Sequence, residues 1–553
     1  MREPTFAIRL LPEDRTYDAE APTDLYLAAA AAGILLEQPC GGRGTCGRCR
    51  ARVLAGAPPA SDADRTVLSA AELDAGWRLG CQLVVGSAAT IEIPSVSRSL
   101  AGKSFGGDIP AEMLGHPVIA REPPAAGPRY GLAVDVGTTS LAAALVSLDD
   151  GAVAASASAL NPQAAFGADV ISRIRHTLDV PAGLDHLRDA VRAGLAALAG
   201  QLTTEAGCAV QDIALAAVAG NPTMMQAWRG VPVASLGRAP FEAAWSGPLR
   251  IEADEVGLPI RPTAPVLVFP LVRSHVGGDL AAAAVACGLD LEGRAGGGPR
   301  LLIDLGTNTE LLLACGGRTL TTSAAAGPAF EGGTIRQGMR GGPGAIDIVS
   351  ISADGRVTTH AIGSPPARGI CGSGLIDAVA ELLRAGIVSP SGYLRRAGEV
   401  TAPALAARLS RLDGQQSFTL VDEDPGGSGA VRLVARDIRE VQLAKGSILA
   451  AASLLCRRAG IRIEDLGEVL VAGAFGNCIR KSSALRIGLL PPIDPERVRL
   501  AGNAAGVGAR LALVDARVFD RAGALAARTE YVDLAGDPGY QDALMAALAF
   551  PDR

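Results

Sequence analysis

The feature that most restricts the fold of this chain is one short segment that occurs twice. Residues 132–145 read LAVDVGTTSLAAAL, and residues 301–314 read LLIDLGTNTELLLA. Each copy is an apolar run, the turn Asp-x-Gly-Thr and a second apolar run, which predicts a strand, a tight turn and a strand. The two copies lie much farther apart than the units of a solenoid. They therefore predict two similar lobes that face one another.

The two turns carry the residue types that bind phosphate. Gly137 and Gly306 permit a tight turn after each strand, and Asp135 and Asp304 place a carboxylate on each side of a cleft. Carboxylates across a cleft suit Mg²⁺, which keeps several of its waters. The residues that offer donors to phosphate oxygens are Thr138, Thr139, Thr307 and Asn308. The P-loop pattern GxxxxGK[ST] does not occur in the sequence.

Further segments complete a candidate nucleotide site. The segment VLVAGAFGN, residues 469–477, predicts a strand that leads into a turn of small residues over which adenine could lie. That turn comprises Gly473, Ala474, Phe475 and Gly476. Two Ala-rich segments, 277–286 and 502–513, predict helices that pack closely where the lobes hinge. Glu310 is a candidate for orienting a Mg²⁺-bound water, although an exposed Glu at a strand end is equally compatible with the sequence.

A third glycine-rich segment offers additional phosphate contacts. It comprises Gly372, Ser373 and Gly374 within GICGSGLID, residues 369–377. The alternative interpretation is a helix N-terminus that Ser373 caps.

Four of the ten cysteines cluster near the N-terminus, in the pattern Cys40-x5-Cys46-x2-Cys49, with Cys81 after 31 further residues. Thiolates are soft ligands for iron–sulfur clusters or zinc. The three-plus-one spacing favours a 2Fe–2S cluster, and its x5 gap is one residue longer than the plant-type pattern. Zinc is the alternative, although zinc sites usually pair two short Cys hooks.

The predicted elements around these cysteines suggest a β-grasp domain. Strands are expected at 5–11, 16–20, 50–54, 83–85 and 90–93, and helices at 24–36 and 69–73. From residue 130 onward, apolar strand-like runs alternate with Ala-rich helical segments, the pattern of an α/β or α+β multidomain fold. We therefore expect a ferredoxin-type domain over 1–95, a linker over 96–129, a first lobe over 130–290 and a second lobe over 291–553. The last helices of the chain are expected to return to the first lobe.

Composition excludes several classes of function. The formal net charge is −6, which does not suit a dedicated nucleic-acid binder. The N-terminal segment MREPTFAIRLLPEDR lacks the apolar stretch of a signal peptide, and the apolar run 25–36 is too short to span a bilayer. We therefore expect a cytoplasmic protein with no membrane or nucleic-acid partner.

The order of phosphate turn, connecting helix, second phosphate turn, adenosine turn and second connecting helix resembles the acetate/sugar kinase–Hsp70–actin superfamily, over about residues 130–516. Within it, the chain resembles the reductive activators of corrinoid proteins, which fuse a 2Fe–2S domain to this ATPase fold. The segments that carry the resemblance are PCGGRGTCGRC (39–49), NPQAAFGADVISRI (161–174), SAAAGPAFEGG (323–333), GICGSGLID (369–377) and REVQLAKGSI (439–448).

The resemblance implies ATP-dependent reduction of a corrinoid-binding methyltransferase protein from Co(II) to Co(I) by one electron from the cluster. Plant-type 2Fe–2S centres have potentials of about −400 mV, and the Co(II)/Co(I) couple is expected to lie lower. Because each gap of about 59 mV costs tenfold in a one-electron equilibrium, a ferredoxin domain alone would rarely succeed. ATP binding and lobe closure, followed by hydrolysis, would shift and reset that equilibrium. A low-potential electron donor and a homodimer are also implied.

The chain departs from the family pattern in GNPTMMQ, residues 220–226, where Pro222 and Gln226 replace the usual Thr and His. The last cysteine is Cys478, so the sequence has no C-terminal cysteine-rich extension for further clusters. Two alternatives remain at this point. One is a small-molecule kinase of the superfamily with a redox-sensing domain, and the other is an ATP-driven electron donor to another low-potential enzyme, such as a 2-hydroxyacyl-CoA dehydratase.

Overall fold

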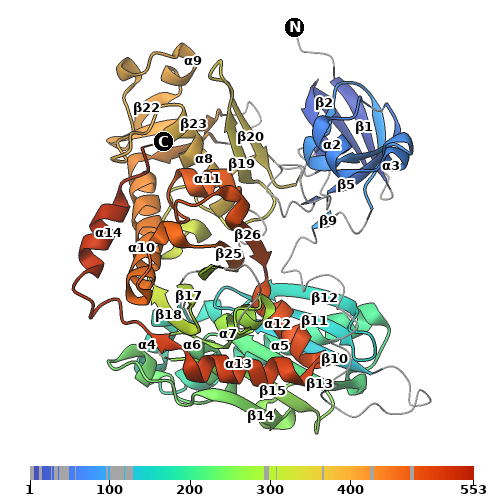
Figure 1. The fold of residues 1–553 in the computed structure, drawn as a ribbon, viewed down its shortest axis with the longest axis vertical. Coiled ribbons are helices and arrows are strands. Elements are labelled where there is room, and N and C mark those ends of the chain that lie inside the picture. Colours follow the sequence, from blue (N-terminus) through green and yellow to red (C-terminus); the bar gives the residue numbers. More distant parts are fainter. Residues whose placement is uncertain are drawn as a thin grey trace.

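The structure is a computed structural model and shows an N-terminal domain beside a larger two-lobed unit (Figure 1). It describes residues 5–11, 15–20, 22–25, 28–29, 35–36, 49–56, 58–94, 98–99, 118, 129–167, 169–273, 275–291, 298–306, 308–363, 366–423, 429–473 and 479–552.

The N-terminal domain is built on a five-stranded sheet of order β2-β1-β8-β5-β6, in which β1 pairs with β2 antiparallel and with β8 parallel. Its core is a cluster of buried apolar side chains that includes Ile8, Leu10, Ile91 and both described cysteines of the cluster motif. The elements are β1 (Thr5–Leu11), β2 (Arg15–Glu20), β3 (Thr23–Asp24), β4 (Leu35–Leu36), β5 (Arg50–Ala55), α2 (Asp62–Val67), α3 (Ala70–Asp74), β6 (Trp77–Leu79), η1 (Gly80–Gln82), β7 (Val84–Val85), β8 (Ala89–Glu92) and β9 (Arg98–Ser99).

The predicted helix over 24–36 is wrong at both ends. Asp24 belongs to β3, and Leu35–Leu36 forms β4, which pairs with β9 at Arg98–Ser99. Residues 25, 28 and 29 are helical and bury Leu25, Ala28 and Ala29. The sequence also did not indicate α2, β6 or the pairing of β9 within the expected linker, because these elements are short and depend on tertiary contacts.

The first lobe of the larger unit contains a six-stranded sheet of order β12-β11-β10-β13-β15-β14. Strands β10, β13 and β15 are parallel, and β10–β11–β12 is an antiparallel meander. Its elements are β10 (Tyr130–Val136), β11 (Ser140–Ser147), β12 (Val153–Leu160), η5 (Pro162–Ala165), α4 (Val170–Asp179), α5 (Gly183–Ala206), η6 (Val210–Asp212), β13 (Ile213–Gly220), α6 (Pro222–Arg229), η7 (Ala234–Gly237), β14 (Gly247–Glu252), η8 (Asp254–Val256), β15 (Pro265–Leu271) and α7 (Gly278–Ala286).

The second lobe repeats this plan with a sheet of order β26-β25-β16-β17-β18-β27. Two three-stranded sheets, β20-β19-β21 and β22-β23-β24, extend it. Its elements are β16 (Arg300–Leu305), β17 (Thr309–Cys315), β18 (Arg318–Ala324), η9 (Pro328–Glu331), β19 (Ala345–Ile351), β20 (Val357–Ala361), β21 (Gly369–Ile370), α8 (Gly372–Arg384), η10 (Ala397–Glu399), α9 (Pro403–Ala406), β22 (Leu409–Leu412), β23 (Gln415–Val421), β24 (Val431–Val434), α10 (Ala435–Ala459), η11 (Ile463–Asp465), β25 (Glu468–Gly473), α11 (Lys481–Arg486), η12 (Pro495–Arg497), β26 (Val498–Gly502), α12 (Ala504–Val514), α13 (Ala516–Arg528), β27 (Glu530–Tyr531) and α14 (Tyr540–Leu548).

The two Ala-rich helices α7 and α12 lie where the lobes join, and their backbones pack closely against each other. Helix α12 packs on α7, and α12 and α13 both lie against strands of the first lobe, as the red helices at the bottom of Figure 1 show. A Cβ added at Gly508 of α12 would lie 2.2 Å from the carbonyl oxygen of Ala282 in α7. Only glycine permits this approach, so the two helices cross at backbone contact.

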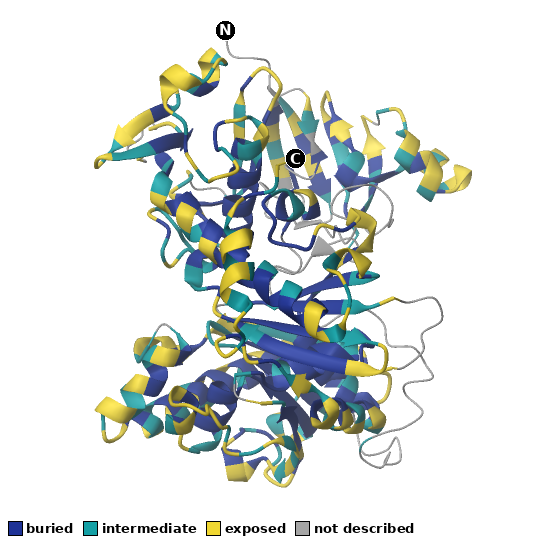
Figure 2. Ribbon diagram, turned by 60° about the vertical axis from the view of Figure 1, so that its left-hand side comes forward, coloured by how far each residue is buried: buried dark blue, intermediate teal, exposed yellow. Residues whose placement is uncertain are grey.

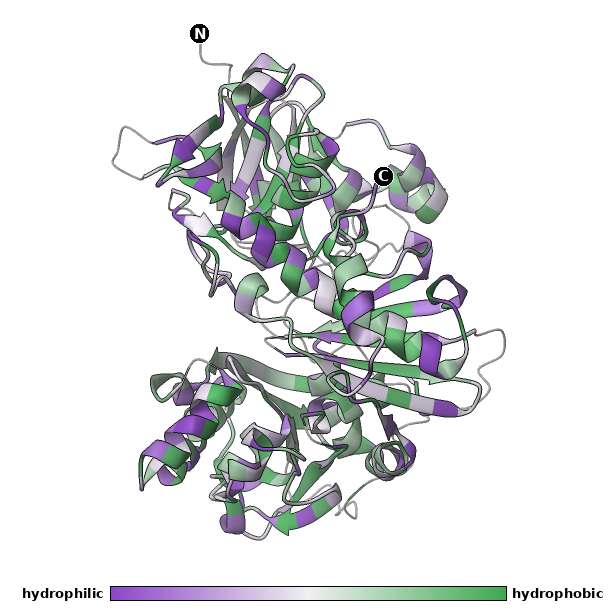
Figure 3. Ribbon diagram, turned by 90° about the vertical axis from the view of Figure 1, so that its left-hand side faces the viewer, coloured by the Kyte–Doolittle hydropathy of each residue, from purple (hydrophilic) through white to green (hydrophobic). Residues whose placement is uncertain are grey.

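The cores lie between the sheets and the helices that cover them. The central strands are almost wholly buried, and exposed residues gather on the outer helices and turns (Figure 2). Hydropathy follows the same division, since the central strands are mostly hydrophobic whereas the outer helices alternate (Figure 3). One core cluster, which includes Ala133, Ala282, Leu312 and Ala509, contains residues from both lobes and both connecting helices.

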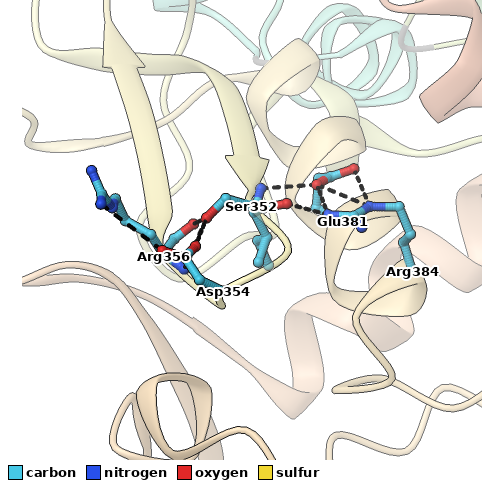
Figure 4. A network of polar contacts seen from close by, with 6 residues as sticks. Ser352, Asp354, Arg356, Glu381 and Arg384 are labelled. Carbon is cyan, nitrogen blue, oxygen red and sulfur yellow. Dashed lines mark hydrogen bonds and ion pairs between the residues drawn. The ribbon is translucent and has the colours of Figure 1, made fainter. Parts of the chain in front are cut away.

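A polar network fixes the orientation of α8 on its neighbouring hairpin (Figure 4). Glu381 of α8 accepts a hydrogen bond from the backbone N–H of Ile351 at 2.9 Å and an ion pair from Arg384 at 2.8 Å. At the tip of the hairpin, Ser352 Oγ accepts from the backbone N–H of Arg356 at 3.1 Å. The contacts of Glu381 hold α8, whose first turn contains Gly372, Ser373 and Gly374, against the hairpin.

Candidate functional site

The two duplicated turns face each other across one cleft. Gly137–Thr139 connects β10 to β11, and residues 306–308 connect β16 to β17. The cleft contains about 680 Å³ of empty space, part of it open to solvent. The described residues that line it are Asp135, Gly137, Thr138, Thr139, Ser140, Asn221, Asp279, Asp304, Leu305, Gly306, Asn308, Glu310, Glu331, Gly473, Asn503 and Ala505.

Most of the sequence-predicted site residues are thus brought together. Thr307 and residues 474–476 of the expected adenosine turn lie outside the described residues. Gly372, Ser373 and Gly374 form the first turn of α8 and are not among the described residues that line the cleft. The N-cap of α8 is Cys371, which makes no side-chain capping hydrogen bond.

The first turn is closed by a hydrogen bond from the backbone N–H of Gly137 to the carbonyl oxygen of Ser140, at 3.0 Å. Asn221, which the sequence did not single out, donates through Nδ2 to Thr138 Oγ1 at 3.0 Å and accepts from the N–H of Met224 as the N-cap of α6. The unusual Gln226 of the same segment is fully buried and bonds to the backbone of Pro232 and Ala244. Gln226 therefore holds the local backbone.

The second turn lies in an acidic environment. Asp304 of β16 stands opposite Glu310 of β17 in the strand register, and Asp279 at the start of α7 approaches both. Burial, and then the charge of Asp304, raise the pKa of Asp279 to about 7. Burial and the charges of Asp279 and Asp304 raise the pKa of Glu310 well above its usual range. A cation at this turn would relieve the repulsion among these groups.

Gly473 allows the end of β25 to approach the second turn. Its φ is +92°, and a Cβ there would lie 2.3 Å from the carbonyl oxygen of Leu305 and 2.6 Å from Asp304 Oδ1. A side chain at this position would therefore displace the carboxylate. This close approach explains the glycine that the sequence places directly after the strand.

A hydrogen bond between the lobes and a buried amide group indicate what kind of ligand fits the cleft. Thr139 Oγ1 of the first lobe donates to Glu331 Oε2 of the second at 3.0 Å, which links the lobes across the opening. Asn503, the N-cap of α12, is 5% exposed, and its Nδ2 has no hydrogen-bond partner within the described ranges. A buried amide that lacks a partner costs free energy unless a ligand or water pairs with it. The cleft therefore fits a ligand with acceptor oxygens, such as a nucleotide.

The charges around the cleft are strongly one-sided. Five of the described lining residues are carboxylates, namely Asp135, Asp279, Asp304, Glu310 and Glu331, and none is Lys, Arg or His. Among the described residues, no group of three or more His, Cys, Asp and Glu side chains is close enough to hold a metal ion directly. A cation bound here would therefore interact with these carboxylates partly through its own waters.

Half of the cysteine motif is described, and its geometry suits a cluster. Cys49 lies directly before β5, and Cys81 lies in η1. Both are buried, and the backbone N–H of Cys81 donates to Cys49 Sγ at 3.5 Å. N–H groups that point at sulfur are the means by which proteins support iron–sulfur clusters. Cys40 and Cys46 lie outside the described residues.

Family models cover most of the chain. Residues 8–86 match a 2Fe-2S iron-sulfur cluster binding domain, residues 130–292 match the RACo middle region, and residues 299–553 match the C-terminal domain of RACo, the ASKHA domain. The middle and C-terminal matches meet between the two lobes. None of the helices in the described ranges is both long enough and apolar enough to cross a membrane.

Individual relatives agree with these matches. The corrinoid activation enzyme RamQ of Eubacterium limosum is 35% identical over 429 residues, which are 77% of this chain and 71% of the relative. The [Co(II) methylated amine-specific corrinoid protein] reductase of Methanosarcina barkeri is 26% identical over 46% of each chain. The solved structure of a reductive activator for a corrinoid, iron-sulfur protein is 28% identical, with a TM-score of 0.69 over 99% of this chain and 98% of that chain.

Proposed function

The chain belongs to the RACo family of corrinoid activators, and from that premise we propose that it reduces the corrinoid of a methyltransferase protein from Co(II) to Co(I) with the help of ATP. The observation that carries the proposal is the match to a reductive activator over nearly the full length of both chains. It includes the iron–sulfur domain and the ATPase unit in the same order. The corrinoid is the substrate.

The reaction transfers one electron, which reduces the cobalt of the corrinoid from Co(II) to Co(I). A 2Fe–2S cluster held by Cys40, Cys46, Cys49 and Cys81 would supply that electron, and a separate low-potential donor would replace it. Because the transfer runs uphill, the nucleotide must bind one conformation of the complex more tightly than another. The opposed turns, the interlobe Thr139–Glu331 contact and the close crossing of α7 and α12 are the parts of this chain that would respond to it.

The proposed residue roles combine the sequence motifs with the parts of the two sites that the structure describes. We propose that the cluster is held by Cys40, Cys46, Cys49 and Cys81. The catalytic carboxylates that act on a hydrated Mg²⁺ are Asp135, Asp304 and Glu310. The residues that contact nucleotide are Gly137, Thr138, Thr139, Gly306, Thr307, Asn308, Gly473, Ala474, Phe475 and Gly476, with Gly372, Ser373 and Gly374 as additional phosphate contacts.

The charge of the cleft supports our proposal of a divalent cation such as Mg²⁺. A triphosphate would enter a space that five carboxylates line, so a divalent cation must separate the two sets of negative charge. Asp279, which the sequence analysis did not identify, joins this group because it lies beside Asp304 and Glu310.

The organisation of the protein is part of the proposal. We place the ferredoxin-type domain at 1–95, the linker at 96–129 and the lobes at 130–290 and 291–553. We further propose a cytoplasmic homodimer with no nucleic-acid or membrane partner. The kinase and the dehydratase-donor alternatives gain no support from the relatives, whose names refer to corrinoid proteins.

The proposal is tested by anaerobic absorbance spectroscopy. The protein is reduced, mixed with a panel of recombinant corrinoid proteins in the Co(II) form, and monitored for Co(I) with and without Mg-ATP. We expect Co(I) to form with at least one corrinoid protein only when Mg-ATP is present. Cys81→Ser should abolish the signal, and Asp304→Asn should slow its appearance on the order of 100-fold.

A different result would contradict the activator proposal. If no corrinoid protein in the panel is reduced while the protein hydrolyses ATP in response to a small alcohol or acid, the activator proposal fails and the kinase alternative is favoured. Cys208→Ser is the matched control, because Cys208 lies far along the chain in the first lobe and is only half-buried. It should leave Co(I) formation unchanged.

A further inference from the structure

The segment NPQAAFGADVISRI, residues 161–174, received no chemical role from the sequence, yet two of its polar side chains lie directly against the first phosphate turn. Asn161 is the N-cap of η5, and Arg173 lies in the first half of α4. Both side chains are fully buried. A buried guanidinium is rare unless its donors are satisfied, so the acceptors of Arg173 show what it does.

Both side chains hold consecutive carbonyl groups of the turn. Asn161 Nδ2 donates to the carbonyl oxygen of Gly137 at 2.9 Å, and Arg173 Nη2 donates to that of Thr138 at 2.7 Å. In a trans peptide the C=O and the following N–H point in opposite directions. Anchoring these two oxygens from behind therefore directs the N–H groups of Thr138 and Thr139 away from Asn161 and Arg173.

The remaining donors of Arg173 fix the guanidinium itself. Nε donates to the carbonyl oxygen of Gly167 at 2.9 Å, and Nη1 donates to Gln163 Oε1 and to Met224 Sδ, each at 3.1 Å. Gln163 is itself held by a bond to the carbonyl oxygen of Leu187 at 2.9 Å. The guanidinium is thus clamped between η5, α4 and α6, and the turn rests on this rigid support.

No carboxylate in the part of the chain that the structure describes contacts the Arg173 guanidinium. Its described hydrogen-bond acceptors are backbone and amide oxygens and a thioether, while Asp169 and Glu331 act on it only as nearby charges. Burial lowers the pKa of Arg173 to about 10, so the group stays protonated at neutral pH. A cation that bonds to a peptide oxygen polarises that peptide and strengthens its N–H as a donor.

We propose that Arg173 is a positioning residue for nucleotide phosphate: it holds the carbonyl of Thr138 so that the N–H of Thr139 is presented to a phosphate oxygen, and it supplies positive charge behind a cleft whose described lining has no basic residue. Asn161 does the same, without charge, for the preceding peptide. This inference rests on the proposed nucleotide-binding function and names residues that act behind the site.

The test compares Arg173→Gln and Arg173→Lys with Arg175→Gln in the full-length holoprotein. Arg175 lies on the same helix but is exposed and pairs only with Asp179 among the described residues. The dissociation constant of a non-hydrolysable Mg-ATP analogue is measured by calorimetry, and KM and kcat are measured for ATP hydrolysis. Cluster content and the thermal midpoint of each variant report on folding.

We expect Arg173→Gln to raise the Kd and the KM about tenfold or more, since a hydrogen bond from a charged group is lost. Arg173→Lys should recover part of the affinity because the charge remains, and Arg175→Gln should match the wild type. The Lys variant decides the question if the Gln variant does not fold. Wild-type Kd and KM in either folded Arg173 variant would overturn the inference, as would a loss confined to kcat.

These measurements distinguish a failure of the positioning role of Arg173 from a failure of the proposed ATP-dependent function. If the wild-type protein itself does not bind the Mg-ATP analogue, the proposed ATP-dependent function fails. If the wild type binds and the folded Arg173 variants bind equally well, only the positioning role fails. If Arg173→Lys also does not fold, Asn161→Ala is measured in the same way, and a wild-type Kd there overturns the proposed support of the turn.

Discussion

The two phosphate turns are near copies in sequence, yet their surroundings differ in charge and in kind. Buried Asn161 and Arg173 support the first turn from behind. On the cleft side of this turn, Asn221 donates to Thr138 and Glu331 accepts from Thr139. Carboxylates surround the second, where Asp304 meets Glu310 and Asp279. Both copies of the duplicated unit are thus antiparallel strand pairs, but different side chains surround their turns.

This difference indicates that the two turns bind different parts of the ligand. Hydrogen-bond donors and positive charge behind the first turn favour phosphate, whereas clustered carboxylates at the second favour a hydrated divalent cation. The following predictions test this division, from the largest expected effect to the smallest.

Removing the charge at the second turn should have the largest effect. Asp304→Asn keeps the shape of the side chain but weakens the field that holds the cation. We expect ATP turnover to fall on the order of 100-fold, the usual loss when one preorganised electrostatic group is removed. Steady-state ATPase assays over a Mg²⁺ titration check this, and the half-saturating Mg²⁺ concentration should rise. Exposed Asp149→Asn is the control, and an unchanged Mg²⁺ requirement in Asp304→Asn would contradict the assignment.

A side chain at Gly473 should disturb the second turn without changing its charge. Gly473→Ala forces a Cβ against the backbone of Leu305 and the carboxylate of Asp304 at a positive φ. Such strain costs about 1–3 kcal/mol, so we expect a lower thermal midpoint and a KM for ATP raised by about tenfold. Gly200→Ala in α5 is the matched control, because a Cβ there meets open space. Equal behaviour of the two variants would show that the close approach is unimportant.

The first turn can be weakened by one neutral hydrogen bond. Asn221→Ser retains an oxygen to cap α6 but is too short to reach Thr138. Loss of about 1 kcal/mol predicts a rise in the KM for ATP of about fivefold, with an unchanged Mg²⁺ requirement. A shift in the half-saturating Mg²⁺ concentration instead would contradict the division between the turns.

Stability should depend on pH through the acidic side of the cleft. Because the pKa of folded Asp279 is about 7, above its unfolded value, the folded state holds the extra proton and stability is lost as the pH rises toward 7. Glu310 adds to this trend in the same direction. In chelator, Asp279→Asn should flatten the fall in unfolding free energy between about pH 4 and 7. An unchanged slope in denaturant titrations would contradict the raised pKa of Asp279.

The site residues that could be predicted from the sequence are those whose position follows from the apolar pattern of the neighbouring strand. Both turns, Glu310 and Gly473 stand beside strands whose apolar pattern is plain, so their place at strand ends could be deduced. Asp279 and Asn503 were missed because each opens an Ala-rich helix that was interpreted only as packing. A polar residue at the start of an otherwise apolar helix was the available signal, since that end must face solvent or a ligand.

Other residues could not be placed without tertiary structure. Arg173 lies between Ile171 and Ile174 on the amphipathic helix α4. The pattern of apolar residues in this helix does not reveal that the guanidinium of Arg173 points inward and bonds to Thr138. The helix expected over 24–36 was cut short by pairing of β3 with β7 and of β4 with β9, contacts that join distant segments. The β-grasp and two-lobed architecture was nevertheless predicted, because strand patterns and the internal duplication extend over long stretches.

The most direct test of the central claim is a single-turnover experiment followed by electron paramagnetic resonance. Protein with its cluster reduced, freed of other reductant, is mixed with an equal amount of a Co(II) corrinoid protein that the absorbance screen identified, and Mg-ATP is added. The account predicts that the signals of the reduced cluster and of Co(II) disappear together, one for one, and only with Mg-ATP. Loss of the Co(II) signal without ATP, or ATP hydrolysis with both signals unchanged, would contradict it.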